Sequence, residues 1–190
     1  ITGKISPSGV LTDTIAKTYK DYPSSENFGG KDLNKYTEDI FVGYRYFETF
    51  AKEDVLYPFG FGLSYTEFSE KLVSAKKENG TLFIDVEIEN TGKYSGKDVL
   101  QFYVEAPQGL LGKSKRSLCA FKKTALLLPG EKEILHTEIE ISDLASYDDG
   151  GITGNKSCYV LEKGEYTILV GNSVRNLTAT DYKYVVSEDT

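Results

Sequence analysis

The feature that most constrains the fold is a strict alternation of apolar and polar residues in the second half of the chain. Residues 81–90 read TLFIDVEIEN, in which aliphatic residues occupy every second position. Successive side chains of a β-strand point to opposite faces, so this period of two predicts a strand with one buried and one wet face. The Asn79-Gly80 pair just before it is a strong signal for a type I′ β-hairpin.

The same pattern recurs after about residue 69. Further alternating runs are DVLQFYVEA (98–106), EILHTEIEI (133–141), EYTILVG (165–171) and DYKYVV (181–186), with Gly, Pro and Asn turn signals between them. About seven short strands with this punctuation indicate a two-sheet β-sandwich of the immunoglobulin or fibronectin type III kind. Because the chain contains no Trp, the Cys-Trp-Cys core of true immunoglobulin domains is absent, which favours the fibronectin-like alternative.

The first 68 residues are of a different kind. They are rich in Pro, Gly, Ser and Asp, with at most a short strand around Val10–Ile15 and one compact element of undecided type in YTEDIFVGYRYFETFAKED (36–54). Such a segment cannot bury a core of its own. We expect it to be the mostly irregular tail of a larger domain. The chain also begins at Ile1 and contains no Met, so we expect a processed or cut piece.

Composition excludes several classes of partner. The net charge is -7 and the pI about 4.9, so the chain lacks the electrostatic footprint of a nucleic-acid-binding protein. We expect the basic run GKSKR (112–116) to be a solvated loop rather than an anion site. No apolar run approaches the ~18 residues of a membrane span, and no signal peptide is visible. We therefore expect no membrane insertion, and either a cytoplasmic or a secreted location.

Metal sites, cofactors and catalytic residues are not predicted. Cys119 and Cys158 show no metal-type spacing, so we expect free thiols, with a single disulfide as the alternative. His136, the only histidine, lies on an alternating strand and is expected to face outward. The YDDGG run at 147–151 lacks the spacing of a calcium loop. Acidic residues fall on outer strand faces or in turns, where solvated charges belong.

Aromatic residues crowd the end of the first segment. Nine lie within residues 44–68: Tyr44, Tyr46, Phe47, Phe50, Tyr57, Phe59, Phe61, Tyr65 and Phe68. Rings with polar rims fill irregular junctions between domains and also stack on sugar faces. Without further context the junction is the favoured explanation. Gly60 and Gly62 fit it, because they allow backbone turns that a Cβ would obstruct.

Several motifs, in order along nearly the whole chain, resemble the C-terminal portion of glycoside hydrolase family 3, the β-glucosidase and β-xylosidase family. They are SPSGVLTDTIAKTYKDYP, EDIFVGYRYF, VLYPFGFGLSYTEF, VEIENTGKYSGKDVLQFYVEAP, LLLPGEKEI and YVLEKGEYTILVGNSVRNL. The resemblance implies that residues 1–68 are the end of an α/β-sandwich domain with its linker, and residues 69–190 a fibronectin type III-like domain. It also implies that a catalytic barrel and the rest of the α/β-sandwich domain are partners in the same enzyme.

For that parent enzyme the resemblance implies retaining hydrolysis of terminal β-D-glycosides by two carboxylates. The family's nucleophile and acid/base motifs match no stretch of this chain, so no catalytic residue is carried over and the chain alone is expected to be inactive. Tyr44, Arg45, Phe59 and Phe61 are the residues expected at the rim of the sugar pocket in the intact enzyme. The order of domains in the parent and its oligomeric state stay open.

A non-catalytic carbohydrate-binding or surface-adhesion module is the alternative. It would require an exposed aromatic platform on the sandwich, for which Phe83 and Tyr103 are weak candidates, because both face away from the predicted core. Outward aromatic residues on strands are often cross-strand pairs instead.

Overall fold

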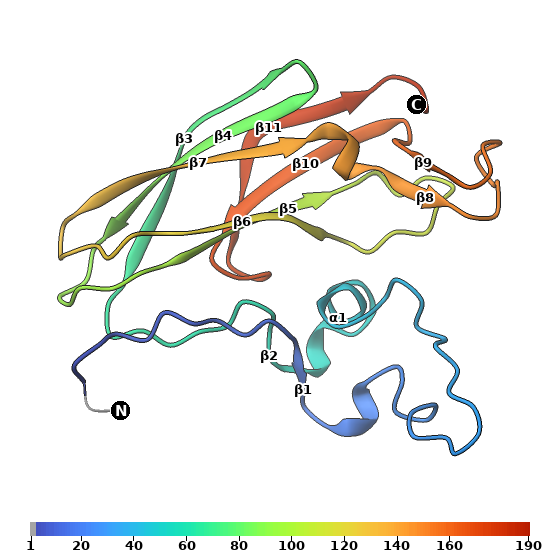
Figure 1. Cartoon of the computed structure of the whole chain (residues 1–190), viewed down its shortest axis with the longest axis horizontal. Coiled ribbons are helices and arrows are strands. Elements are labelled where there is room, and N and C mark those ends of the chain that lie inside the picture. Colours follow the sequence, from blue (N-terminus) through green and yellow to red (C-terminus); the bar gives the residue numbers. More distant parts are fainter. Residues whose placement is uncertain (1–2) are drawn as a thin grey trace.

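The computed structural model describes residues 3–190, and its larger part is a sandwich of two antiparallel sheets (Figure 1). One sheet has three strands in the order β3 (Phe68–Glu78), β4 (Thr81–Asn90) and β7 (Lys132–Glu140). The other has four in the order β11 (Leu177–Val186), β10 (Gly164–Gly171), β5 (Val99–Glu105) and β6 (Ser117–Lys123). The predicted mainly-β, fibronectin type III-like fold is confirmed.

The hairpin of β3 and β4 follows the alternation closely. Leu82, Ile84, Val86 and Ile88 are buried, whereas the residues between them are partly exposed. Asn79 and Gly80 have φ values of 49° and 87°, as a type I′ turn requires at both central positions. The sequence pattern therefore sets both the turn and the face that β4 turns inward.

The sandwich core is a single cluster between the two sheets. It contains sixteen buried hydrophobic residues: Leu82, Ile84, Val86, Ile88, Leu100, Phe102, Val104, Leu127, Leu135, Ile139, Ile141, Leu144, Tyr166, Ile168, Val170 and Val186. Fully burying one large aliphatic or aromatic side chain contributes about 1.5–3 kcal/mol. Because both sheets supply residues to it, this cluster holds them together.

Residues 3–67, which we call the N-terminal segment, lie as a separate layer beside one face of the sandwich (Figure 1). Their elements are short: β1 (Ile15–Ala16), η1 (Tyr19–Asp21), α1 (Tyr44–Phe50), η2 (Lys52–Asp54) and β2 (Val55–Tyr57). The strand expected at Val10–Ile15 is wrong in position, because only Ile15 and Ala16 pair with β2. The compact element of undecided type contains the seven-residue helix α1.

A second segment outside the two main sheets connects β7 to β10. It contains η3 (Ile141–Leu144) and the hairpin of β8 (Ser146–Asp148) and β9 (Cys158–Val160). The Asp148 carboxylate, expected not to be a calcium ligand, accepts the N–H groups of Gly151, Ile152 and Thr153 at 2.6–3.1 Å. Although burial alone would raise the pKa of Asp148, these bonds and the Thr153 hydroxyl lower it to about 2. This carboxylate serves to fold its own loop.

No helix within residues 3–190 combines the length and the apolar character needed to cross a membrane.

Candidate functional site: the junction of segment and sandwich

The N-terminal segment docks on the sandwich through an aromatic cluster, which we call the junction cluster. Its buried residues are Tyr103, Leu169 and Val174, packed against Tyr44, Phe59, Leu118 and Leu177. The Tyr44 ring centroid lies 4.9 Å from that of Phe59 and 5.9 Å from that of Tyr103. Edge-to-face and tilted pairs at such distances add about 0.5–1.5 kcal/mol each beyond the burial of apolar area.

Tyr103 corrects an expectation. Its side chain does face away from the sandwich core, but it is 0% exposed because the N-terminal segment covers it. Its hydroxyl donates to Gln101 Oε1 at 2.6 Å, and burial raises its pKa. Tyr103 therefore belongs to the contact between the N-terminal segment and the sandwich, and offers no exposed platform for a ligand.

Hydrogen bonds fix the orientation of α1 above the cluster. The Tyr44 hydroxyl accepts the Leu118 N–H at 2.9 Å, and Thr49 Oγ1 accepts the Lys115 N–H at 2.9 Å. Each bond joins residues more than 60 positions apart in the sequence. The helix is therefore held by β6 and by the loop before it.

An ion pair with the sandwich holds the other side of α1 in place. Arg175 Nε lies 2.7 Å from Glu48 Oε1, and a second guanidinium nitrogen of Arg175 donates to the Lys52 carbonyl at 2.7 Å. The Glu48 side chain is only 3% exposed and that of Arg175 27%. Removing one member of a buried pair leaves an uncompensated charge, which is strongly destabilising. Glu48 thus depends on the sandwich for its counter-ion.

Gly60 allows the linker to approach the sandwich. Its φ is 84°, and a Cβ at this position would lie 2.7 Å from both Gln101 Nε2 and the Ser173 Cα. The Val174 N–H donates to the Phe59 carbonyl at 3.1 Å next to it. The expectation that Gly60 allows a backbone turn that a Cβ would obstruct is confirmed.

The loop between β5 and β6 differs from its predicted form. Lys113, expected to be solvated, is 7% exposed and forms a buried ion pair with Glu162, which is 2% exposed. Glu162 Oε1 also accepts the Leu110 N–H at 2.5 Å, and Lys113 Nζ donates to the Pro107 carbonyl at 2.9 Å. The pair organises the loop that reaches α1 through Lys115.

The four residues predicted at the sugar rim are only partly brought together. Tyr44 and Phe59 are in contact within the junction cluster. The Phe61 ring lies against Tyr57 instead, with centroids 4.9 Å apart. Arg45 follows Tyr44 on α1, where its carbonyl accepts the Thr49 hydroxyl at 2.6 Å. Whether these four side chains contact a substrate stays a prediction.

Phe61 also lines a cavity of about 390 Å³, which we call the junction pocket. Its walls come from separate stretches of the chain: residues 7–10, residues 60–64 and 66–68 of the linker, residues 97–98 before β5, and residues 172–173 after β10. The pocket therefore lies where the N-terminal segment, the linker and the sandwich meet.

Two carboxyl groups near this pocket are unusual. Burial, and after it the neighbouring Asp98, raise the pKa of Glu70 to about 7, and burial raises the pKa of Asp98. Glu70 Oε1 and Asp98 Oδ2 are both buried and have no hydrogen-bond partner among residues 3–190. Sequence reasoning missed this pair, because the two residues are 28 positions apart and the inward position of Glu70 on β3 breaks the alternation.

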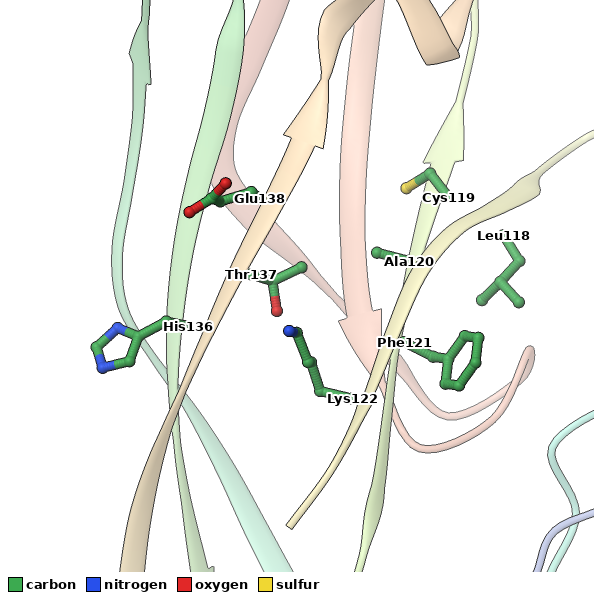
Figure 2. A pocket seen from close by; sticks show the side chains of 8 residues that line it. All are labelled: Leu118, Cys119, Ala120, Phe121, Lys122, His136, Thr137 and Glu138. Atoms are coloured by element: carbon green, nitrogen blue, oxygen red, sulfur yellow. The ribbon is translucent and has the colours of Figure 1, made fainter.

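A larger cavity of about 580 Å³ lies between the edge strands β6 and β7. Figure 2 shows Thr137 and Lys122 reaching into the space between the strands, while His136 projects to the other side. The His136 side chain is 76% exposed, as predicted, and pairs with Asp85 at 2.7 Å. Both cysteines are free, and burial raises the pKa of Cys119 to about 12. A thiol with so high a pKa is a poor nucleophile.

The N-terminal segment leaves much apolar surface uncovered. More than half of the exposed large hydrophobic side chains found in residues 3–190 belong to it: Ile5, Ile15, Tyr19, Phe28, Leu33, Tyr36, Ile40, Val42, Phe50, Leu56, Tyr57, Leu63 and Tyr65. The N-terminal segment therefore carries a larger share of these side chains than its share of the chain's length. Within the same residues, no group of three or more His, Cys, Asp or Glu side chains is placed to hold a metal ion.

Comparison with known proteins agrees with this architecture. A family model described as a fibronectin type III-like domain matches residues 98–174. A β-glucosidase of Ruminococcus albus is 51% identical over 92% of this chain, and β-glucosidase A of Butyrivibrio fibrisolvens is 46% identical over 98%. The chain spans only 18% and 25%, respectively, of the lengths of these relatives.

Solved structures give the same result. A β-glucosidase from Paenibacillus barengoltzii matches 98% of this chain with a TM-score of 0.95 and 53% identity, and the match covers 21% of that protein. β-Glucosidase 3B from Thermotoga neapolitana, solved in complex with glucose, matches the whole chain with a TM-score of 0.88 and 41% identity, over 26% of its own length.

Proposed function

Because this chain belongs to glycoside hydrolase family 3, we propose that it is the non-catalytic, domain-packing part of a β-glucosidase that hydrolyses terminal β-D-glycosides with retention. One observation carries the proposal: a complete sandwich holds, through the junction cluster, a segment that is rich in uncovered apolar residues. The other domains of the same enzyme are the partners that would cover this surface.

The catalytic carboxylates of the parent belong, in this proposal, to its barrel and to the rest of its α/β-sandwich domain. Residues 1–68 would be the end of that α/β-sandwich domain with its linker, and residues 69–190 the fibronectin type III-like domain. The task of this chain is then to fix the position of the segment. The hydrogen bonds to Tyr44 and Thr49 and the Glu48–Arg175 pair support this role.

Tyr44, Arg45, Phe59 and Phe61 are proposed at the rim of the sugar pocket in the assembled enzyme. Tyr44 and Phe59 also pack in the junction cluster, so their rim role has to be separated from their packing role. In the intact enzyme, Phe59→Ala should lower thermal stability, because it truncates a packed ring. The loss should be smaller than the about 3–5 kcal/mol of a fully buried ring, since Phe59 is only partly buried in this chain. An increased KM at an unchanged melting temperature would instead identify Phe59 mainly as a substrate contact.

The direct test is hydrolysis of p-nitrophenyl β-glucoside by this chain alone and after mixing with the rest of the parent polypeptide. We expect activity only in the mixture. A chain carrying Tyr103→Ala should restore less activity, whereas Tyr94→Ala, on an exposed ring outside the junction cluster, serves as the matched control. Hydrolysis by the chain alone would overturn the proposal.

The alternative, a carbohydrate-binding or adhesion module, finds less support. Tyr103 is buried, and Phe83 is half-buried beneath Lys76, whose ammonium lies 5.9 Å from the ring centroid. The exposed Tyr147 and Tyr159 rings are inclined at 62° to each other, so they do not form a flat platform. Lack of binding to insoluble glucans in a pull-down would remove this alternative.

A further inference from the structure

Two acidic side chains point inward at the end of the sandwich where the linker joins it. On β3, Glu70 lies between Phe68 and Leu72, and both of these residues pack against the sandwich core. Asp98 directly precedes β5 and lies two residues before Leu100, which is fully buried in the same core. Alternate residues of an extended chain share one face, so Glu70 and Asp98 both face the space between the sheets.

Close packing brings these two stretches of the chain together. A Cβ on Gly96 would lie 2.7 Å from Thr66 Cγ2 and 3.2 Å from Phe68 Cζ. From this contact onward, β3 and β5 run in the same direction (Figure 1). Two residues further along each stretch, Glu70 and Asp98 therefore face each other across the sandwich, and we call them the carboxyl pair.

The carboxyl pair lacks partners. Glu70 Oε1 and Asp98 Oδ2 are buried and accept no hydrogen bond from residues 3–190. None of the ion pairs among these residues includes either group. The other charged side chains on the adjoining stretches are Glu67, Lys71, Glu87, Glu89, Lys97, Lys122, Lys123 and Glu133. Two facing carboxylates without a counter-ion are unfavourable, and one proton between them relieves the repulsion.

The same end of the sandwich holds the linker. Thr66 Oγ1 donates to Asn90 Oδ1 at 2.6 Å, and the Thr91 N–H donates to the Glu67 carbonyl at 2.9 Å. Asn90, the last residue of β4, is 0% exposed. These two bonds tie the linker to the end of β4 within four residues of Glu70. Repulsion across the carboxyl pair would therefore act on the attachment of the linker.

We propose that the carboxyl pair is a pH-sensitive switch for the attachment of the linker to the sandwich. In the protonated pair, the Glu70 O–H donates to Asp98 Oδ2, so that both buried oxygens gain a partner and β3 stays against the stretch 96–98. When Glu70 transfers this proton to water, two carboxylates face each other and the attachment loosens. The proton is the ligand of the switch. The inference concerns contacts within this chain, so it goes beyond the packing function and does not depend on it.

The pH range of the switch follows from the pKa of Glu70. Burial, and after it the charge of Asp98, raise this pKa from 4.5 to about 7 while the linker is attached. A Glu70 carboxyl that is released to water regains its ordinary pKa, so the attached state binds the proton more tightly. The attachment is therefore strongest below pH 4.5, weakens as the pH rises through this range, and is weakest above pH about 7.

Amide hydrogen exchange of the 190-residue chain, followed by NMR at about pH 5 and about pH 8, tests the switch. Each rate is divided by that of an unstructured peptide at the same pH. The Thr91 N–H is the reporter, because its acceptor is the Glu67 carbonyl. We expect opening at Thr91 to increase about tenfold from the lower to the higher pH. Opening at Ser157, whose N–H donates to the Asp148 carbonyl at 2.7 Å in the loop between β8 and β9, should not change.

Two substitutions identify the groups of the switch. Glu70→Gln replaces the acid by an amide that can donate at every pH, so opening at Thr91 should become independent of pH. Asp98→Asn removes the facing charge, so the midpoint of the Glu70 carboxyl in a carbon-13 titration should move from about 7 toward its ordinary value. The matched control is Glu138→Gln, at an exposed position on β7, which should change neither measurement.

The spectra also report whether each variant is folded, and if Glu70→Gln does not fold, the carbon-13 titrations of the unsubstituted chain and of Asp98→Asn still decide. A Glu70 carboxyl that titrates near 4.5 in the unsubstituted chain would overturn the inference. A pH response at Thr91 that persists in Glu70→Gln, or equal opening at the two pH values, would overturn it as well. Neither the parent enzyme nor its activity enters these measurements, so the packing function is judged separately.

Discussion

Sixteen buried hydrophobic residues meet in one cluster inside the sandwich, whereas the separate core of the N-terminal segment is formed by three, Ala16, Phe47 and Val55. The segment also carries most of the exposed large apolar side chains, although it makes up only about a third of the chain. Folding must offset a conformational entropy of roughly 1–2 kcal/mol per residue of backbone. The sandwich buries enough apolar surface to offset this entropy cost by itself, and the N-terminal segment does not.

This difference shows that the N-terminal segment depends on contacts with other parts of the protein for its ordered structure. On one side it takes hydrogen bonds, the Arg175 counter-ion and the Tyr103 ring from the sandwich. Its other side is uncovered within this chain. A segment that is supported on one side only is expected to open more readily than the sandwich, and to become stable when a second partner covers it.

The largest effect should come from the sandwich core. Phe102→Ala removes a ring that is 0% exposed, and should lower the free energy of unfolding by about 3–5 kcal/mol. Phe47→Ala, also at a 0% exposed ring, should unfold the segment locally and leave most of that free energy intact. Urea denaturation read by circular dichroism measures both. Equal losses from both substitutions would show that the two regions form one cooperative unit.

A smaller effect should come from the ion pair between the regions. Arg175→Ala leaves the buried Glu48 carboxylate without its counter-ion and should cost about 2–3 kcal/mol, less than a fully buried pair because Arg175 is partly exposed. Hydrogen exchange should accelerate in α1 and leave β4 unchanged. The double variant Glu48→Gln/Arg175→Ala should recover part of the loss. Acceleration throughout β4 would contradict a local role for this pair.

A still smaller effect should come from the pH dependence of the unfolding free energy, which arises in the sandwich. The pKa of Glu70 is raised from 4.5 to about 7, so the folded state disfavours the ionised carboxylate. Between these values the folded state binds more protons than the unfolded state, and stability therefore falls as pH rises. The contribution should be about 1–2 kcal/mol after allowance for partial exposure.

Urea midpoints measured on both sides of this pH range test the prediction. Glu70→Gln should flatten the pH dependence, whereas Glu138→Gln, at an exposed position on β7, should not alter it. An unchanged slope in Glu70→Gln would show that the proton is bound elsewhere.

The smallest effect should come from the exposed ion pairs of the sandwich. Lys132 lies 2.9 Å from Glu87 and 3.2 Å from Glu89, but its side chain is 50% exposed. Lys132→Ala should change the unfolding free energy less than any of the substitutions above, and less still at high salt. A larger loss in the same urea experiment would mean that outer charges, and not only the core, distinguish the sandwich from the segment.

The sandwich could be predicted because the sequence signals that specify its strands and turns are local. The alternation in residues 81–90 fixes the inward face of β4, and Asn79-Gly80 fixes the turn before it. Each signal depends on neighbours in the sequence, which is where propensity and periodicity act. The same holds for the outward position of His136.

The junction could be predicted only in outline. The density of rings pointed to a domain junction, but not to the burial of Tyr103 on the outer face of β5, which depends on a helix 59 positions earlier in the chain. The Lys113–Glu162 pair was missed for the same reason, since a basic loop residue gives no local sign of a distant counter-ion. Contacts of this length follow from the tertiary fold alone.

The most direct test of the difference between the two regions is amide hydrogen exchange of the 190-residue chain, alone and mixed with the rest of the parent polypeptide. We predict strong protection of β4 and β10 in both samples, and protection of residues 3–67 that is weak in the chain alone and increases on mixing. Equal protection of both regions in the chain alone, with no change on mixing, would contradict the proposal that the segment is supported on one side and awaits a partner on the other.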